Sequence, residues 1–416
     1  MIRPYQVRRY LAGLIALVVI STLIVWNSKS KIKDPYGDYS EKKETWHNEW
    51  QAHLKKDTKV ILLYTTWFDH QFWNGMEGSK LYKFFEKCPK PKNCLLTYDR
   101  SWLSKADITI FHGRDVEMAK NSYYSPRTLK EVRKAVPKDK PWVYLSHENP
   151  QKDLSYYQPY DGLFNMTATF DRRSDIFVAY GTYLKHYEVK GNARNYAKEK
   201  TSLVAWAVSN CGLLREDYAL ELEKYVSLTV YGRCRKHFKK QRNCAHNSYT
   251  CRKELSKYKF YLAFENNFCH DYVTEKYWER LEQDVVPVVM GANYDNGLVI
   301  PESYIDASKF DSIQKLAEYL LYLDKNDDEY NKYFSYKANY KMGDMTIYCQ
   351  ICDSLHENSL VATRQVELSA EYNYERNCGA YKPKMKLIRK QIENSQKSSS
   401  QLTLLWRRLR RFLRLW

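Results

Sequence analysis

Glycine is scarce in this sequence, and no glycine-rich phosphate-binding loop is present. Glycine accounts for only 14 of the 416 residues, and neither the P-loop spacing nor the G-x-G-x-x-G spacing of dinucleotide-binding folds occurs. These absences disfavour a P-loop kinase and an NAD-dependent enzyme. The chain also lacks any D-x-D triplet. The sequence therefore does not support a site in which carboxylates of such a triplet hold a metal ion that binds the diphosphate. Basic side chains would have to hold a diphosphate instead.

The size and composition predict a folded protein with two lobes. A chain of 416 residues is too long for one ordinary hydrophobic core. Hydrophobic residues make up 44% and aromatic residues 15% of it, which is enough apolar surface to oppose global disorder. The formal net charge of +18 favours anionic partners. Charge alone leaves nucleic acid, phosphate groups and an acidic membrane surface open.

Most of the ten cysteines lie in close pairs. The pairs are Cys88 and Cys94, Cys244 and Cys251, and Cys349 and Cys352. The chain also begins with a segment typical of proteins that enter the oxidising secretory pathway. We therefore expect disulfide bonds.

An apolar segment near the N-terminus predicts a membrane anchor. Residues 11–26 carry no charge and are flanked by arginines before them and lysines after them. The segment is short for a membrane span, but Tyr10 and Trp26 suit the two interfaces. A cleaved signal peptide is the alternative, although no A-x-A-like site follows the segment. We predict an uncleaved signal anchor at 11–26, with a cytoplasmic tail at 1–10, a polar stem at 27–57 and the body of the chain in the lumen.

Strand and helix signals alternate along that body. Short runs rich in β-forming residues predict buried strands at 59–66, 106–112 and 142–146, with a helix at 125–136. The pattern repeats, with strands at 203–208, 228–231, 260–264 and 285–290 and helices at 216–225, 275–281 and 311–323. Such alternation is typical of parallel, doubly wound α/β sheets. We predict two Rossmann-like lobes facing a cleft, with ligands outside the carboxyl ends of the strands.

Residues that could bind a ligand or take part in catalysis are most concentrated at 258–291. The predicted strand there places Glu265 and Asn266 at its carboxyl edge. A helix then begins near Thr274, whose hydroxyl is a suitable N-cap. The amide groups at that helix start, together with Lys276, predict a seat for phosphate oxygens. The alternative interpretation is structural, namely a solvated helix face and a strand-end carboxylate.

The order of residues in this segment resembles one family. F-E-N, a short loop, D-Y-V-T-E-K and then V-P-V-V-x-G closely resemble the hallmark of the α1,3-fucosyltransferases, glycosyltransferase family ten. Further segments resemble that family in family order, namely 106–115, 146–150, 164–181, 204–211 followed by Arg215, 229–234, 301–310 and 349–352. The resemblance covers residues 58–355, nearly the whole predicted lumenal body.

The resemblance implies a GT-B fold, with acceptor binding in a lobe at 58–190 and GDP-fucose binding in a lobe at 200–375. It implies an inverting α1,3-fucosyltransferase that moves L-fucose from GDP-β-L-fucose to the 3-hydroxyl of N-acetylglucosamine in glycoprotein glycans. It also implies a single-pass type II protein of the Golgi membrane. A membrane-tethered glycan-binding protein on the same fold, without turnover, is the alternative. Nucleic-acid binding is disfavoured because no nucleic-acid module is recognised.

Roles for individual residues follow from the same resemblance. Glu148 matches the general base, which takes a proton from the acceptor hydroxyl. Its neighbour His147 is a rival, although a loop histidine with no chemical task is the favoured interpretation. Arg215 and Lys276 match cations that hold the diphosphate without a metal. The other matched residues are Glu275 at the ribose, Glu265 facing the fucose, and Asn266 and Tyr272 in the donor pocket.

The resemblance extends to the cysteines and to a glycosylation sequon. Cys349 and Cys352 resemble the family's C-terminal C-x-x-C, whose cysteines bridge to the N-terminal lobe, and this implies Cys88 and Cys94 as their partners. A metal-binding or redox C-x-x-C is the alternative. Asn165 begins an N-M-T sequon inside a family motif, and its occupancy by a glycan stays open.

The end of the chain predicts a basic amphipathic helix. Over residues 400–416, apolar side chains recur every three or four positions opposite five arginines. We place this helix in a basic tail at 376–416, where a membrane surface and the protein's own surface are equal alternatives for its apolar face. We expect no metal and no tightly bound cofactor. Stimulation by Mn²⁺, a homodimer, and the choice between an N-glycan core and a Lewis-type antenna as acceptor stay open.

Overall fold

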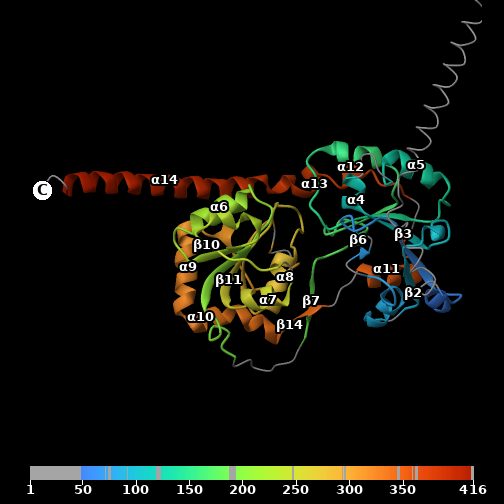
Figure 1. The fold of residues 1–416 in the computed structure, drawn as a ribbon, viewed down its shortest axis with the longest axis horizontal. Helices are drawn as coiled ribbons and strands as arrows, with labels where there is room; N and C mark the ends of the chain where they lie inside the picture. The colour runs from blue at the N-terminus through green and yellow to red at the C-terminus, as the bar shows by residue number, and fades with distance from the viewer. Residues whose placement is uncertain are drawn as a thin grey trace, which may run out of the picture. The chain divides into compact units, whose positions relative to one another are not determined.

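Figure 1 shows the fold in the computed structural model. The structure describes residues 48–413 apart from 71, 74–75, 91, 119–122, 187–193, 246–247, 293, 295–296, 344–346, 358 and 361–363. The predicted cytoplasmic tail, the signal anchor and most of the stem lie outside the described residues. Among the helices that the structure does describe, none is both long enough and apolar enough to cross a bilayer.

The first six-stranded sheet has the strand order β2-β1-β3-β4-β5-β6. β1 pairs in parallel with β2 and β3, and β3 pairs in parallel with β4. Every residue of β3 and β4 is buried, as expected for parallel strands covered on both faces. The strands are β1 Lys59–Leu63, β2 Cys94–Thr97, β3 Ile108–His112, β4 Trp142–Ser146, β5 Met166–Thr169 and β6 Ile176–Phe177. The three strands predicted in this part of the chain are therefore confirmed, whereas β2, β5 and β6 were not predicted.

The second six-stranded sheet has the order β10-β9-β8-β11-β12-β13 and is also parallel. Its strands are β8 Ser202–Ala207, β9 Leu228–Tyr231, β10 Lys240–Gln241, β11 Tyr258–Phe264, β12 Val286–Met290 and β13 Ile305–Asp306. The helices associated with it are α6 Leu214–Leu222, α7 Tyr249–Leu255, α8 Glu275–Glu282, α9 Ile313–Lys325 and α10 Asp327–Asn331. All four strands and all three helices predicted here are present, and no end differs from its predicted position by more than three residues. The prediction of two parallel Rossmann-like sheets is confirmed.

The remaining elements are shorter or lie outside the two sheets. The other helices are α3 Lys80–Lys83, α4 Gly113–Met118, α5 Pro126–Lys134, α11 Ile347–His356, α12 Leu368–Glu371, α13 Tyr374–Cys378 and α14 Lys382–Leu413. β7 Thr182–Lys185 and β14 Tyr340–Gly343 form an antiparallel pair. The 3-10 helices are η2 Phe84–Lys87, η3 Arg100–Trp102, η4 Leu154–Tyr156, η5 Gln158–Tyr160, η6 Arg233–His237, η7 Ala307–Lys309, η8 Lys332–Ala338 and η9 Gly379–Tyr381.

The chain divides into two compact units whose boundaries differ from the predicted lobes. Of the described residues, the first unit contains those from 48 to 145, together with Pro159–Met166 and Ile351–Val366. The second unit contains Ser146–Gln158, Thr167–Gln350 and Glu367 onward. The segment that carries Glu148, predicted to belong to the first lobe, thus groups with the second unit. The chain crosses between the units several times, so a single boundary near residues 190–200 does not describe it.

The first part of helix α14 belongs to the hydrophobic core of the second unit. Ile388 and Ile392 are buried in the hydrophobic cluster that also contains residues of β8, β11 and α9. The Ser395 hydroxyl donates a 2.7 Å hydrogen bond to the buried Glu221 carboxylate on α6, and Figure 1 shows α14 running beside that helix. The predicted C-terminal helix is present, but it begins at Lys382. The side chains from 399 onward lie outside the described residues.

The cysteines form disulfides, as expected. The bridges are Cys94–Cys352, Cys211–Cys234, Cys244–Cys251 and Cys269–Cys378, and Cys88 and Cys349 are disulfide-bonded as well. The bond between Cys94 and Cys352 is the type of link that the family resemblance implied for the C-x-x-C. Since Cys349 and Cys352 are both disulfide-bonded, the C-x-x-C offers no thiolate to a metal, and its metal-binding interpretation is wrong.

The sequon asparagine is part of the first unit's interior. Asn165 is 5% exposed, and its side-chain oxygen accepts a 2.9 Å hydrogen bond from the Trp142 amide. Its side-chain nitrogen, the atom that would carry a glycan, donates to the Arg364 carbonyl at 3.0 Å. A glycan on that nitrogen would have to displace this packing, so in the folded state Asn165 acts as a structural residue.

Candidate active site

The site is built at the carboxyl end of β11, in the interior of the second sheet. All seven residues of β11 are buried, and its neighbours in the sheet are β8 and β12. The next residue, Glu265, continues the pairing with β12 because its amide donates a 2.9 Å hydrogen bond to the Met290 carbonyl. Glu265 is only 1% exposed. The strand therefore delivers a carboxylate to the sheet edge but keeps it out of bulk water.

The Glu265 carboxylate is bound to the start of α8. It accepts hydrogen bonds from the Thr274 amide at 2.9 Å and from the Thr274 hydroxyl at 3.0 Å. Its second oxygen lies 3.1 Å from the Lys276 ammonium. Burial raises the pKa of the Glu265 carboxyl, and the positive charge of Lys276 offsets this only in part. Glu265 thus ties the strand end to the helix start through its side chain.

Thr274 is the N-cap of α8, as predicted, because its side chain accepts a hydrogen bond from the Lys276 amide. The Lys276 ammonium donates to the Thr274 hydroxyl at 2.6 Å and lies 3.2 Å from the Glu275 carboxylate. Burial alone would lower the pKa of Lys276, but the carboxylates of Glu265 and Glu275 outweigh it and raise that pKa. For Glu275, burial acts to raise the pKa, but Lys276 and hydrogen bonds at the helix start lower it overall. The lysine and Glu275 are therefore both charged at neutral pH.

Arg215 brings a second cation to the same strand end. It lies in the first turn of α6 and is 5% exposed. Its guanidinium donates to the Phe264 carbonyl at 2.8 Å and to the Asn210 carbonyl at 3.3 Å, while its buried Nε has no partner among the described residues. Burial lowers the pKa of Arg215, yet a guanidinium stays protonated at neutral pH. An unpaired buried N–H on a fixed cation is a donor available to an anionic ligand.

A cavity of about 260 Å³ lies beside these cations, at the carboxyl ends of β8 and β9. Arg215, Glu275 and Lys276 line it. Sequence reasoning missed two further wall residues, Gly232 and Arg280. Gly232 has φ +87°, and a Cβ atom there would lie 2.3 Å from the Val208 carbonyl oxygen, so only glycine fits this wall. Arg280 is buried with its guanidinium 4.3 Å from the centre of the Tyr261 ring.

Glu148 approaches this region through its backbone. The Tyr372 hydroxyl donates to the Glu148 carbonyl, and the Tyr180 hydroxyl donates to the His147 carbonyl at 2.6 Å. The next residue, Asn149, accepts a 2.8 Å hydrogen bond from the Asn266 side chain. Among the described residues, the Glu148 carboxylate itself has no hydrogen-bond or ion-pair partner. The segment is thus held in place while its carboxylate remains available.

Tyr272 lies among the predicted carboxylates. Its hydroxyl is buried, and burial followed by the charges of Glu148, Glu265 and Glu275 raises its pKa well above the ordinary value. The negative charges of all three carboxylates therefore raise the pKa of the same hydroxyl group. The structure brings all seven residues predicted for the base and the donor site into one region of the second unit, and their chemical roles remain predictions.

Metal-ligating side chains do cluster among the described residues, but their chemistry does not suit an ion. Two of the three groups contain a disulfide, namely Cys94–Cys352 with His356 and Cys211–Cys234 with Glu216. The third group is Asp171, His270 and Asp271, whose two carboxylates already bind arginine side chains. Arginines in these positions supply the positive charge that a metal would bring.

Comparisons with known proteins agree along most of the chain. The family described as "Fucosyltransferase, N-terminal" matches residues 56–181, and "Glycosyltransferase family 10 (fucosyltransferase) C-term" matches residues 197–370. The glycoprotein 3-alpha-L-fucosyltransferase A of Drosophila melanogaster is 34% identical over 336 residues, which cover 78% of this chain and 62% of that protein. A human 4-galactosyl-N-acetylglucosaminide 3-alpha-L-fucosyltransferase is 33% identical over 316 residues, which cover 74% of this chain and 81% of that protein. A crystal structure of an alpha1,3-fucosyltransferase with GDP-fucose aligns at a TM-score of 0.45 and 15% identity, over 74% of this chain and 94% of that one.

Proposed function

The chain belongs to glycosyltransferase family 10, the fucosyltransferases, and we propose that it is an inverting α1,3-fucosyltransferase. It transfers L-fucose from GDP-β-L-fucose to the 3-hydroxyl of an N-acetylglucosamine in a glycoprotein glycan, and the configuration at the anomeric carbon of fucose is inverted. The observation that carries this proposal is the pair of partly or fully buried cations, Arg215 and Lys276, beside one cavity at the carboxyl end of the second sheet. Both relatives are named for 3-alpha-L-fucosyl transfer, which supports the choice of sugar and linkage.

The donor's diphosphate binds between Arg215, Lys276 and the amides at the start of α8. These groups supply positive charge and N–H donors where charge builds on GDP as the bond to fucose breaks. Glu275 accepts from the ribose hydroxyls, and Asn266 and Tyr272 complete the donor pocket. The absence of a D-x-D triplet fits a diphosphate site in which side-chain cations carry the stabilisation.

Glu148 is the general base of the proposed reaction. The acceptor oxygen bonds to the anomeric carbon of fucose, the bond from that carbon to the diphosphate oxygen breaks, and the acceptor proton passes to the Glu148 carboxylate. The lack of any hydrogen-bond or ion-pair partner for this carboxylate among the described residues supports the assignment. His147 is the weaker alternative, because its ring packs against Tyr180 with the ring centres 4.9 Å apart.

We further propose that the catalytic body works in the lumen of the Golgi, behind the predicted signal anchor at 11–26. The disulfides support an oxidising compartment. The two relatives differ in acceptor, since one is named for glycoproteins and the other for a galactosylated N-acetylglucosamine. Both an N-glycan core and a Lewis-type antenna therefore belong in the test of this function.

The experiment is an acceptor panel read by mass spectrometry. The purified chain is incubated with GDP-fucose and glycans that present either a core or an antennary N-acetylglucosamine, and the mass spectrum identifies the residue that gains fucose. Transfer to the 3-position of either residue is the expected result. No transfer to any acceptor, with GDP still bound in calorimetry, would contradict the proposed reaction and favour the glycan-binding alternative.

A further inference from the structure

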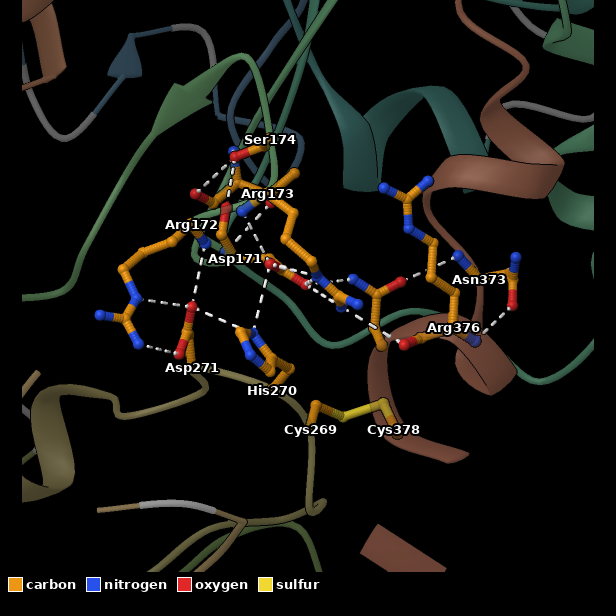
Figure 2. Close-up of polar contacts among 12 residues, drawn as sticks. Asp171, Arg172, Arg173, Ser174, Cys269, His270, Asp271, Asn373, Arg376 and Cys378 are labelled. Carbon is orange, nitrogen blue, oxygen red and sulfur yellow. Dashed lines mark hydrogen bonds and ion pairs between the residues drawn. A yellow bond between two sulfur atoms is a disulfide. The ribbon is translucent and has the colours of Figure 1, made fainter. Parts of the chain in front are cut away.

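Three segments of the second unit meet in a polar network that neither the proposed reaction nor the donor contacts explain. They are residues 171–174, residues 269–271 and residues 373–378, and Figure 2 shows the side chains of Asp171, His270 and Asp271 turned toward one another. The middle segment belongs to the loop between β11 and α8, residues 265–274, which we call the donor loop. We propose that this network, and above all the pair Arg172 and Asp271, positions the donor loop for GDP-fucose and so sets the affinity for the donor. This proposal rests on the proposed function.

Asp271 is the point at which the donor loop is fixed. Its φ of +57° lies in the left-handed region, which is uncommon for residues other than glycine and which aspartate enters more readily than most. Its side chain is 0% exposed. Arg172 binds it three times, from the backbone amide at 3.0 Å, from Nε at 3.0 Å and from a terminal nitrogen at 3.1 Å. A bidentate guanidinium combined with an amide fixes both the position and the orientation of the carboxylate.

Neighbouring contacts hold the loop from the other side. The His270 amide donates a 2.6 Å hydrogen bond to the Asn377 carbonyl, and the Asn377 side chain donates to Asp171 at 2.9 Å. Asp171 in turn pairs with Arg173 and lies 3.3 Å from the His270 ring. One residue earlier, Cys269 is bonded to Cys378. Donor-loop residues 269–271 are thus attached through a disulfide, a backbone hydrogen bond and an ion pair in direct succession.

The fixed residues adjoin residues of the donor site along the chain. Tyr272 follows Asp271 directly, and its ring packs on Phe170 with the ring centres 4.7 Å apart. Thr274, two residues further, caps α8 and binds Glu265. A change in the backbone at Asp271 would move both residues together with the helix start that is proposed to bind the diphosphate. Arg172 and Asp271 are therefore positioning residues rather than catalytic residues.

The test compares variants of this pair with a matched control. Arg172 is 41% exposed, so Arg172→Gln breaks the pair without burying a new group. Asp271→Gly keeps the left-handed backbone accessible but removes the anchor. Arg194→Gln is the control, because Arg194 is 49% exposed and pairs at 2.9 Å with Asp284, another left-handed aspartate with φ +54°, at the opposite end of α8.

We expect Arg172→Gln and Asp271→Gly to raise the KM for GDP-fucose about tenfold, the equivalent of one lost charge-assisted contact, and to weaken GDP in calorimetry by a similar factor. The KM for the acceptor should stay within about twofold, and the double variant should resemble the single variants because both remove the same contact. Arg194→Gln should leave all these values unchanged. The calorimetric readout does not depend on turnover, so failure of the proposed reaction in the wild-type chain is distinguishable from failure of this proposal.

Three outcomes would overturn the inference. One is an unchanged donor KM and GDP affinity in both variants. Another is an equal rise in the donor and acceptor KM values, which would indicate general loss of structure rather than positioning. The third is an equal effect of Arg194→Gln. If Asp271→Gly fails to fold, Arg172→Gln and the conservative Arg172→Lys still decide the matter, since Arg172→Lys should recover part of the GDP affinity.

Discussion

Removing the Lys276 side chain should destabilise the protein in a way that depends on pH. The ammonium lies 3.1 Å from a Glu265 carboxylate oxygen, and the Glu265 side chain is 0% exposed. At that separation an effective dielectric constant of about 20 gives an attraction of about 5 kcal/mol. Lys276→Ala leaves the buried carboxylate with Thr274 as its remaining partner. We expect a loss of about 3 kcal/mol in the free energy of unfolding at pH 7.5, because removing one partner of a buried ion pair leaves the Glu265 carboxylate charged and buried without its counter-ion.

The sign of the pH dependence follows from Glu265. Burial already raises its pKa in the folded protein, and Lys276 is the charge that opposes this. Without the lysine, the pKa in the folded variant rises further above the unfolded value. A carboxyl group whose pKa is higher in the folded than in the unfolded state stabilises the folded protein at low pH. This stabilisation is lost as the pH rises through the pKa of the folded state. The deficit of Lys276→Ala relative to wild type should therefore be larger at pH 7.5 than at pH 5.

The assay is thermal denaturation of wild type and variant at pH 5, 6 and 7.5. A deficit of about 3 kcal/mol corresponds to a midpoint lowered by about 6 to 12 °C in a unit of this size. Adding Glu265→Gln to Lys276→Ala should recover most of the loss at pH 7.5, because an amide can accept from Thr274 without carrying a charge. An equal deficit at all three pH values, or no recovery in the double variant, would refute the electrostatic reasoning.

The same variant tests the donor site. If Lys276 binds the diphosphate, Lys276→Ala should weaken GDP at least about tenfold in calorimetry, since a charge-assisted contact to phosphate is lost. The double variant that recovers stability should still bind GDP weakly. Full GDP affinity in either protein would remove Lys276 from the diphosphate site.

Three further predictions concern separate parts of the site. Glu148→Gln should lower kcat by about 10² to 10⁴-fold and leave GDP affinity unchanged, because the amide cannot take the acceptor proton; near-normal turnover would make the base assignment wrong. Gly232→Ala should cost at least about 2 kcal/mol in thermal denaturation and reduce GDP binding, because its Cβ would lie 2.3 Å from the Val208 carbonyl oxygen. A stable variant with normal GDP affinity would contradict this. Replacing Cys269 and Cys378 together by serine should cost about 2 to 4 kcal/mol, since their bond spans a sequence separation of 109 residues. An unchanged denaturation midpoint would show that the bond contributes no stability.

Much of the fold could be predicted from local sequence. The apolar run at residues 260–264 predicts a buried strand by its length and composition, and the structure extends that strand back to Tyr258 as β11, all of whose residues are buried. Thr274 could be identified as the N-cap because capping depends on residues two or three positions apart. The residues of the candidate site were found through the order of family motifs, since no single one of them is distinctive. Gly232 and Arg280 could not be identified from the sequence, because what distinguishes them is a contact with another part of the fold. Gly232 lies against the Val208 carbonyl oxygen, and Arg280 lies over the Tyr261 ring.

The sequence by itself determined that two parallel α/β sheets form, that the cysteines are oxidised, and that a carboxylate and a cation flank the end of β11. These features depend on periodicity, composition and contacts within one turn or one strand. Only the tertiary structure decided that the Glu148 segment groups with the second unit, that Asn165 is buried, and that Arg172 holds Asp271 across 99 residues of chain. Such pairings depend on how distant segments pack, and no local pattern encodes which partner a surface arginine or an internal asparagine will meet.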